Sequence, residues 1–83
     1  MVDVKIVFEV EQAGCESCAN LIGAALGEVA TVESVATDES ADLATVVLSG
    51  APSPGAVDAA LAEASAGAGH DYRVRAGSWR ALG

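Results

Sequence analysis

Residues 2–29 read VDVKIVFEVEQAGCESCANLIGAALGEV, and their pattern implies a strand, a loop and a helix. The first nine positions alternate, which predicts a strand with one buried face. That face consists of Val2, Val4, Ile6, Phe8 and Val10. Residues 11–14 form a loop, and Cys15 and Cys18 follow it directly. Beyond the two cysteines, apolar side chains recur at helical spacing. They are Leu21, Ile22, Ala25, Leu26 and Val29.

Two further strands are expected after this helix. Residues 32–37 form a weaker strand, and residues 43–48 form a stronger one because its centre is rich in β-branched side chains. The acidic segment DESAD, at residues 38–42, lies between them. A connection this short and polar predicts that the two strands pair as a hairpin.

A second helix is expected after the breaker-rich residues 49–55. Ser53 suits the N-cap position and Pro54 the first helical position. The apolar stripe of this helix consists of Val57, Ala60, Leu61 and Ala64. Gly67 and Gly69 offer C-cap residues that end it. Residues 71–75, in which Tyr72 and Val74 alternate, predict a fourth strand, whereas residues 76–83 show no period.

The predicted order of elements is β-α-β-β-α-β. Packing rules convert this order into a ferredoxin-like α+β fold, a four-stranded antiparallel sheet with both helices on one face. We expect this domain to span residues 1–76 and residues 77–83 to be a C-terminal tail. We expect Trp79, within the tail, to form a patch on the domain surface.

The composition excludes several classes of function. The chain has 83 residues, with 4 Lys and Arg against 12 Asp and Glu, so its net charge is −8. This charge argues against nucleic acid and anionic membranes as partners, because both attract a basic surface. A membrane-spanning helix needs about 18 consecutive apolar residues, and no apolar run in the sequence is that long. The N-terminus lacks the basic and apolar regions of a secretory signal.

Cys15 and Cys18 are three positions apart. A disulfide this local closes almost no loop and stabilises little, so the pair indicates metal binding or redox chemistry in a reducing cytosol. A helix N-terminus stabilises thiolates, which are the form that binds metal. Two sulfurs suit Cu(I) best, whereas structural Zn(II) takes four ligands and an iron–sulfur cluster normally takes four cysteines.

The sequence GCESC at residues 14–18, between a strand and a helix, resembles the heavy-metal-associated domain family, which includes copper chaperones. The resemblance covers residues 2–75. It implies that Cys15 and Cys18 bind a metal, with Cu(I) the leading ion and Zn(II) or another soft metal as alternatives. It also implies a carrier, and not an enzyme, that passes the ion to a metal-transporting P-type ATPase or another acceptor protein.

The resemblance extends to two further positions. The family's motif has Met two positions before the first cysteine, and this chain has Ala13 there, so we expect a less firmly anchored loop. His70 matches a position near the metal in the last loop and is a possible third ligand.

Other functions stay open at this point. The pair could serve a small thiol–disulfide oxidoreductase, a Zn(II) or Hg(II) site, or a degenerate interaction domain. We expect a cytoplasmic protein that is a monomer or a metal-bridged dimer.

Overall fold

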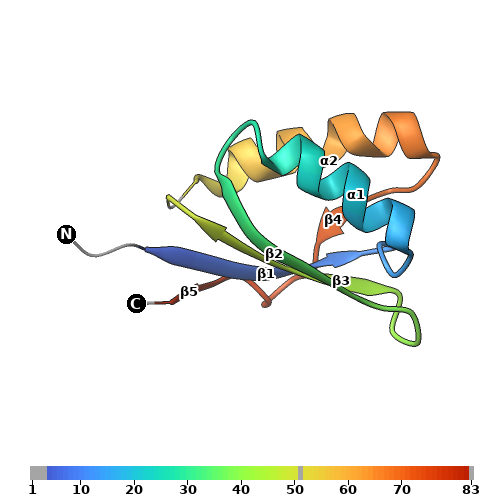
Figure 1. Ribbon diagram of the computed structural model, residues 1–83, viewed down its shortest axis with the longest axis horizontal. Coiled ribbons are helices and arrows are strands. Elements are labelled where there is room, and N and C mark those ends of the chain that lie inside the picture. The colour runs from blue at the N-terminus through green and yellow to red at the C-terminus, as the bar shows by residue number, and fades with distance from the viewer. Residues whose placement is uncertain (1–3, 51, 83) are drawn as a thin grey trace.

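The computed structural model describes residues 4–50 and 52–82 of the chain (Figure 1). These residues form, in order, β1 (Lys5–Glu11), α1 (Glu16–Leu26), β2 (Thr31–Asp38), β3 (Leu43–Ser49), α2 (Pro54–Ala68), β4 (Arg73–Val74) and β5 (Arg80–Leu82). The elements up to β4 follow the predicted order, and β5 is an addition to it.

The sheet has the strand order β2-β3-β1-β4, and every neighbouring pair is antiparallel. Figure 1 shows α1 and α2 together on one face of this sheet. The predicted ferredoxin-like α+β fold is therefore confirmed. The short β5 also pairs antiparallel with β1. It lies on the same edge of β1 as β4, but it pairs with the start of β1 whereas β4 pairs with its end.

The core lies between the sheet and the helices. In β1 and β3 every second side chain points toward the helices and is buried in this core. These side chains are Ile6, Phe8, Val10, Ala44, Val46 and Leu48. Val4 was predicted on the same face, but it precedes β1 and is 37% exposed. Val2 lies outside the described residues.

The buried face of α1 differs in part from the predicted stripe. The helix buries Cys18, Ile22 and Leu26, which follow one another at intervals of four residues. Leu21 is 40% exposed, and Val29 lies beyond the end of the helix and is 39% exposed. Side chains four residues apart share one helix face, so the buried stripe begins at the second cysteine and follows a single row of side chains along the helix.

The second helix begins and ends as predicted. Ser53 Oγ accepts a hydrogen bond from the Ala56 N–H at 3.2 Å, and Pro54 is the first helical residue. Gly69 ends the helix in the left-handed conformation, with φ at +72°. The predicted stripe is buried throughout: Val57, Ala60, Leu61 and Ala64.

The C-terminal segment completes the sheet edge. Trp79 lies half-buried against the core, and its ring stacks on Phe8 with centroids 5.1 Å apart. The Glu9 N–H donates to Ser78 Oγ at 3.0 Å, between the points where β4 and β5 pair with β1. β4 and β5 together therefore cover the edge that one longer strand was predicted to cover. No helix within the described residues is long and apolar enough to span a membrane.

Candidate metal centre

Cys15 is the N-cap of α1. Its backbone is extended, and its Sγ accepts a hydrogen bond from the Cys18 N–H at 3.2 Å. The Oγ of Ser17 lies 3.5 Å from the same sulfur. The sulfur thus takes the place of the oxygen that usually caps a helix. Unpaired N–H groups and the helix dipole favour negative charge here, so this position stabilises a thiolate.

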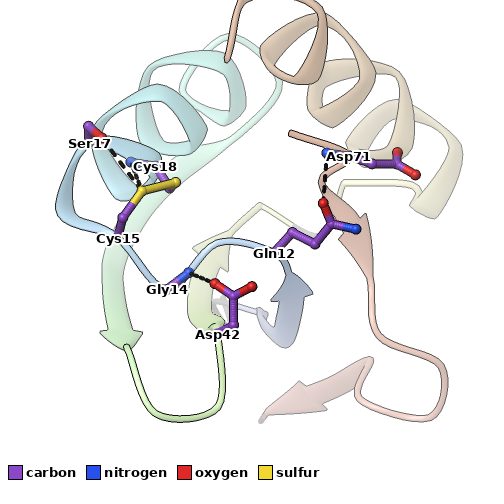
Figure 2. Close-up of a disulfide and its surroundings, with 7 residues drawn as sticks. All are labelled: Gln12, Gly14, Cys15, Ser17, Cys18, Asp42 and Asp71. Carbon is purple, nitrogen blue, oxygen red and sulfur yellow. Dashed lines mark hydrogen bonds between the residues drawn. A yellow bond between two sulfur atoms is a disulfide. The ribbon is translucent and has the colours of Figure 1, made fainter. Parts of the chain in front are cut away.

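Cys15 and Cys18 are joined as a disulfide, with their Cα atoms 5.1 Å apart (Figure 2). The structure therefore shows the oxidised pair. Two electrons and two protons convert this disulfide into the two thiols from which metal-binding thiolates form. Cys18 is only 2% exposed, whereas Cys15 is half-buried, so the pair has one fixed and one more accessible sulfur.

His70 lies beside the cysteine pair. The imidazole nitrogen and the two Sγ atoms all lie within 4.8 Å of one another. His70 is exposed, and its ring stacks on Tyr72 with a centroid distance of 5.7 Å and an interplanar angle of 13°. The fold thus brings the three predicted site residues together, although 52 positions separate His70 from Cys18 in the sequence.

The loop that carries His70 is held at three points. The Gly69 N–H donates to the Ser65 carbonyl at 3.2 Å, and the Tyr72 N–H donates to the Ser65 hydroxyl at 2.9 Å. The Asp71 N–H donates to Gln12 Oε1 at 3.2 Å, a bond drawn in Figure 2. Gln12 therefore links the loop of His70 directly to the loop of Cys15.

The loop before Cys15 is held from the other side by the turn between β2 and β3. Ala13, where the resemblance led us to expect a less firmly anchored loop, is fully buried. Its N–H donates to the Asp42 carbonyl at 3.2 Å, and the Gly14 N–H donates to Asp42 Oδ1 at 3.1 Å. Neither Asp42 nor Gln12 was predicted from the sequence to belong to this region. Both have positive φ, +55° and +59°, but neither residue type reveals such a turn by itself.

Tyr72 supports the site from beneath His70. Its side chain is 3% exposed, and its hydroxyl is buried without a hydrogen-bond partner among the described residues. Burial raises the pKa of this hydroxyl above its usual value. Tyr72 therefore stays neutral and supplies an apolar ring face to the imidazole.

The donor atoms fit a soft ion of low coordination number. Two thiolates and an imidazole suit Cu(I), and they also suit a borderline ion such as Zn(II). A closed structural zinc site takes four ligands, whereas this cluster offers three. Because Cys15 and His70 both reach solvent, a ligand from a second protein can approach the same ion.

Comparison with known proteins gives two matches. The family model of the heavy-metal-associated domain matches residues 7–69. A solved structure described as "Crosstalk between Cu(I) and Zn(II) homeostasis" is similar at 27% identity and a TM-score of 0.57. That match covers 83% of this chain and 97% of the other. No curated protein matches the chain.

Proposed function

Because the chain belongs to the heavy-metal-associated domain family, we propose that it carries a soft metal ion, foremost Cu(I), and passes it to an acceptor protein. The observation that carries this proposal is the cluster of Cys15, Cys18 and His70, whose donor atoms lie within 4.8 Å of one another at an accessible helix N-terminus. The cargo is bound and released, and no bond in a substrate is broken, so the protein acts as a carrier and not as an enzyme.

Each donor has a separate part in this proposal. Cys18 is anchored in the core and holds the ion at a fixed point. Cys15, which is more accessible, binds from the helix cap. His70 adds an imidazole nitrogen to the two thiolates, and a donor set with both nitrogen and sulfur also binds Zn(II). The similar structure concerned with Cu(I) and Zn(II) homeostasis supports testing both ions.

Transfer follows from the low number of ligands. A thiolate of the acceptor can join the ion before Cys15 leaves, so the ion never has to exist free in solution. We propose a metal-transporting P-type ATPase or another thiol-bearing protein as the acceptor, in a reducing cytoplasm that keeps the pair reduced. The net charge of −8 favours an acceptor with a basic docking surface, since complementary charge raises association rates.

The test is an anaerobic titration of the fully reduced protein with Cu(I) against a competing chelator, with Zn(II) in parallel. The control is the Cys15→Ser/Cys18→Ser double variant, which keeps the size of both side chains nearly unchanged. We expect one Cu(I) per chain, bound more tightly than Zn(II), and loss of that binding in the double variant. Equal Cu(I) binding by the wild type and the double variant would refute the proposal.

The disulfide favours one alternative, thiol–disulfide exchange with a partner. In that reaction one thiolate of a partner dithiol attacks a sulfur of the pair, so that the Cys15–Cys18 bond breaks and a mixed disulfide forms. The partner's second thiolate then displaces the bound cysteine, which leaves the pair as two thiols and the partner as a disulfide. The fold argues against it, because α1 is followed by the β2–β3 hairpin where a thioredoxin-type fold would continue with another β-α unit. Catalytic turnover of a disulfide substrate, together with Cu(I) binding no tighter than that of the double variant, would establish the alternative.

A further inference from the structure

The loop that leads into Cys15 rests on the turn at residues 38–42, which we call the hairpin turn. Two consecutive N–H groups of this loop donate to a single residue of the turn, Asp42. The Ala13 N–H donates to its carbonyl at 3.2 Å, and the Gly14 N–H donates to its Oδ1 at 3.1 Å. Figure 2 shows the Asp42 carboxylate pointing at the Gly14 N–H, directly before Cys15.

The hairpin turn is itself held in one conformation. Asp38 Oδ1 accepts from the Ser40 hydroxyl at 2.7 Å, from the Ser40 N–H at 3.1 Å and from the Ala41 N–H at 3.3 Å. The Asp42 N–H donates to the Glu39 carbonyl at 3.3 Å. The Asp42 carboxylate is therefore presented from a turn with its own internal hydrogen bonds, and it can act as a fixed point for the neighbouring loop.

The two segments also lie too close for any side chain at position 14. A Cβ added to Gly14 would lie 2.7 Å from the Asp42 Cα and 2.9 Å from the Asp38 carbonyl oxygen. Both of these are backbone atoms, which cannot rotate away. Asp42 has φ at +55°, a conformation that Asp and Asn tolerate better than most residues. The close approach of the two backbones and the hydrogen bond to the carboxylate thus both join Gly14 to Asp42.

We propose that Asp42 is a positioning residue for the metal centre, which holds Cys15 at its place relative to Cys18. Cys18 is fixed by the core and by α1, whereas Cys15 stands at the helix cap and follows the path of Gly14. The carboxylate anchors the loop directly after the small, fully buried Ala13. The expected effect on metal affinity rests on the proposed function. The hydrogen bonds from the loop to Asp42 can be measured without metal.

The experiment compares Asp42→Gly, Asp42→Asn and Glu39→Gln in the full chain. Glycine accepts the positive φ but removes the carboxylate, whereas asparagine keeps an oxygen acceptor and removes only the charge. Glu39→Gln is the matched control, because it removes one negative charge from the same turn and its side chain makes no hydrogen bond among the described residues. The readouts are Cu(I) affinity by chelator competition, hydrogen exchange of the Gly14 amide, and unfolding by urea.

We expect Asp42→Gly to bind Cu(I) about threefold to tenfold more weakly, the range that one hydrogen bond accounts for. Its Gly14 amide should exchange about tenfold faster. Asp42→Asn and Glu39→Gln should stay within about twofold of the wild type. A variant that unfolds more easily but binds Cu(I) with unchanged affinity would show a purely structural role and overturn the proposal. So would Asp42→Asn behaving like Asp42→Gly, because the charge and not the hydrogen bond would then be responsible.

A failure of the proposed function is distinguishable from a failure of this inference. If the wild type binds Cu(I) no better than the Cys15→Ser/Cys18→Ser variant, the carrier function is refuted. The positioning role is then decided by the equilibrium constant of the Cys15–Cys18 disulfide against glutathione. Loosening Cys15 should lower this constant about threefold in Asp42→Gly, and an unchanged constant overturns the role.

Discussion

Replacing Tyr72 by Phe should stabilise the protein. The side chain is 3% exposed, and its hydroxyl has no hydrogen-bond partner among the described residues. A buried hydroxyl without a partner costs about 1–3 kcal/mol relative to one in water. Tyr72→Phe removes this cost and keeps the ring that stacks on His70. We therefore expect a gain of about 1–2 kcal/mol in the free energy of unfolding, which for a domain of this size is about 4–16 °C in Tm.

The effect also has a pH dependence with a definite sign. Burial raises the pKa of Tyr72, so in the folded protein the hydroxyl keeps its proton to higher pH than in the unfolded chain. Ionisation of Tyr72 therefore costs no stability below the unfolded pKa of about 10, and it costs stability progressively as the pH rises from there through the folded value. Tyr72→Phe lacks this loss. Its advantage over the wild type should therefore widen above about pH 10.

Urea unfolding followed by the fluorescence of Trp79 measures this difference, since the chain has one tryptophan. The m-value should not change, because the two proteins expose nearly the same surface on unfolding. The ionisation of Tyr72 can be followed by absorbance without interference, since the chain has one tyrosine. Cu(I) affinity should not change. A variant that is less stable than the wild type by about 1 kcal/mol or more would mean that the hydroxyl has a hydrogen-bond partner and that the reasoning is wrong.

Three further outcomes are expected. Gln12→Ala removes the acceptor that ties the loop of His70 to the loop of Cys15, and it should weaken Zn(II) binding about threefold, with no added effect in a His70→Ala background. Ser40→Ala removes the hydroxyl that chiefly lowers the pKa of Asp38, so that pKa should rise toward its ordinary value in an NMR titration. Because the Asp38 contribution is present above the unfolded pKa and lost as the pH falls through the folded one, the variant should lose less stability in acid than the wild type. Trp79→Ala should cost about 2–3 kcal/mol of unfolding free energy and leave Cu(I) affinity unchanged, measured by urea unfolding and chelator competition.

Each of these expectations has a contrary result. A further loss of Zn(II) affinity from Gln12→Ala when His70 is already absent would show that Gln12 acts on another ligand. An Asp38 pKa that does not move in Ser40→Ala would assign its low value to the backbone N–H groups of the turn. A Trp79→Ala protein with wild-type stability would mean that the stack on Phe8 contributes nothing in solution.

The local patterns of the sequence were sufficient for the fold and for the cysteine pair. Alternation predicted the strand that became β1, and Ser53 and Pro54 predicted the start of α2, because both signals depend on residues close together in the chain. The same holds for Cys15 at a helix start, where cap and helix are neighbours. The position of His70 could be anticipated only from resemblance to a family. No periodicity in the residues around it points to the cysteines.

The tertiary structure decided how these parts are held. The contacts of Asp42 with Gly14, of Asp71 with Gln12 and of Ser78 with Glu9 join residues 28, 59 and 69 positions apart. Such contacts leave no trace in a local pattern, because each depends on where two separate segments meet in space. β5, with three residues, is likewise too short to show a period. The sequence by itself therefore determined the elements up to β4 and the two cysteine ligands, and the packing of distant segments determined the short β5 and the geometry in which the candidate ligands meet.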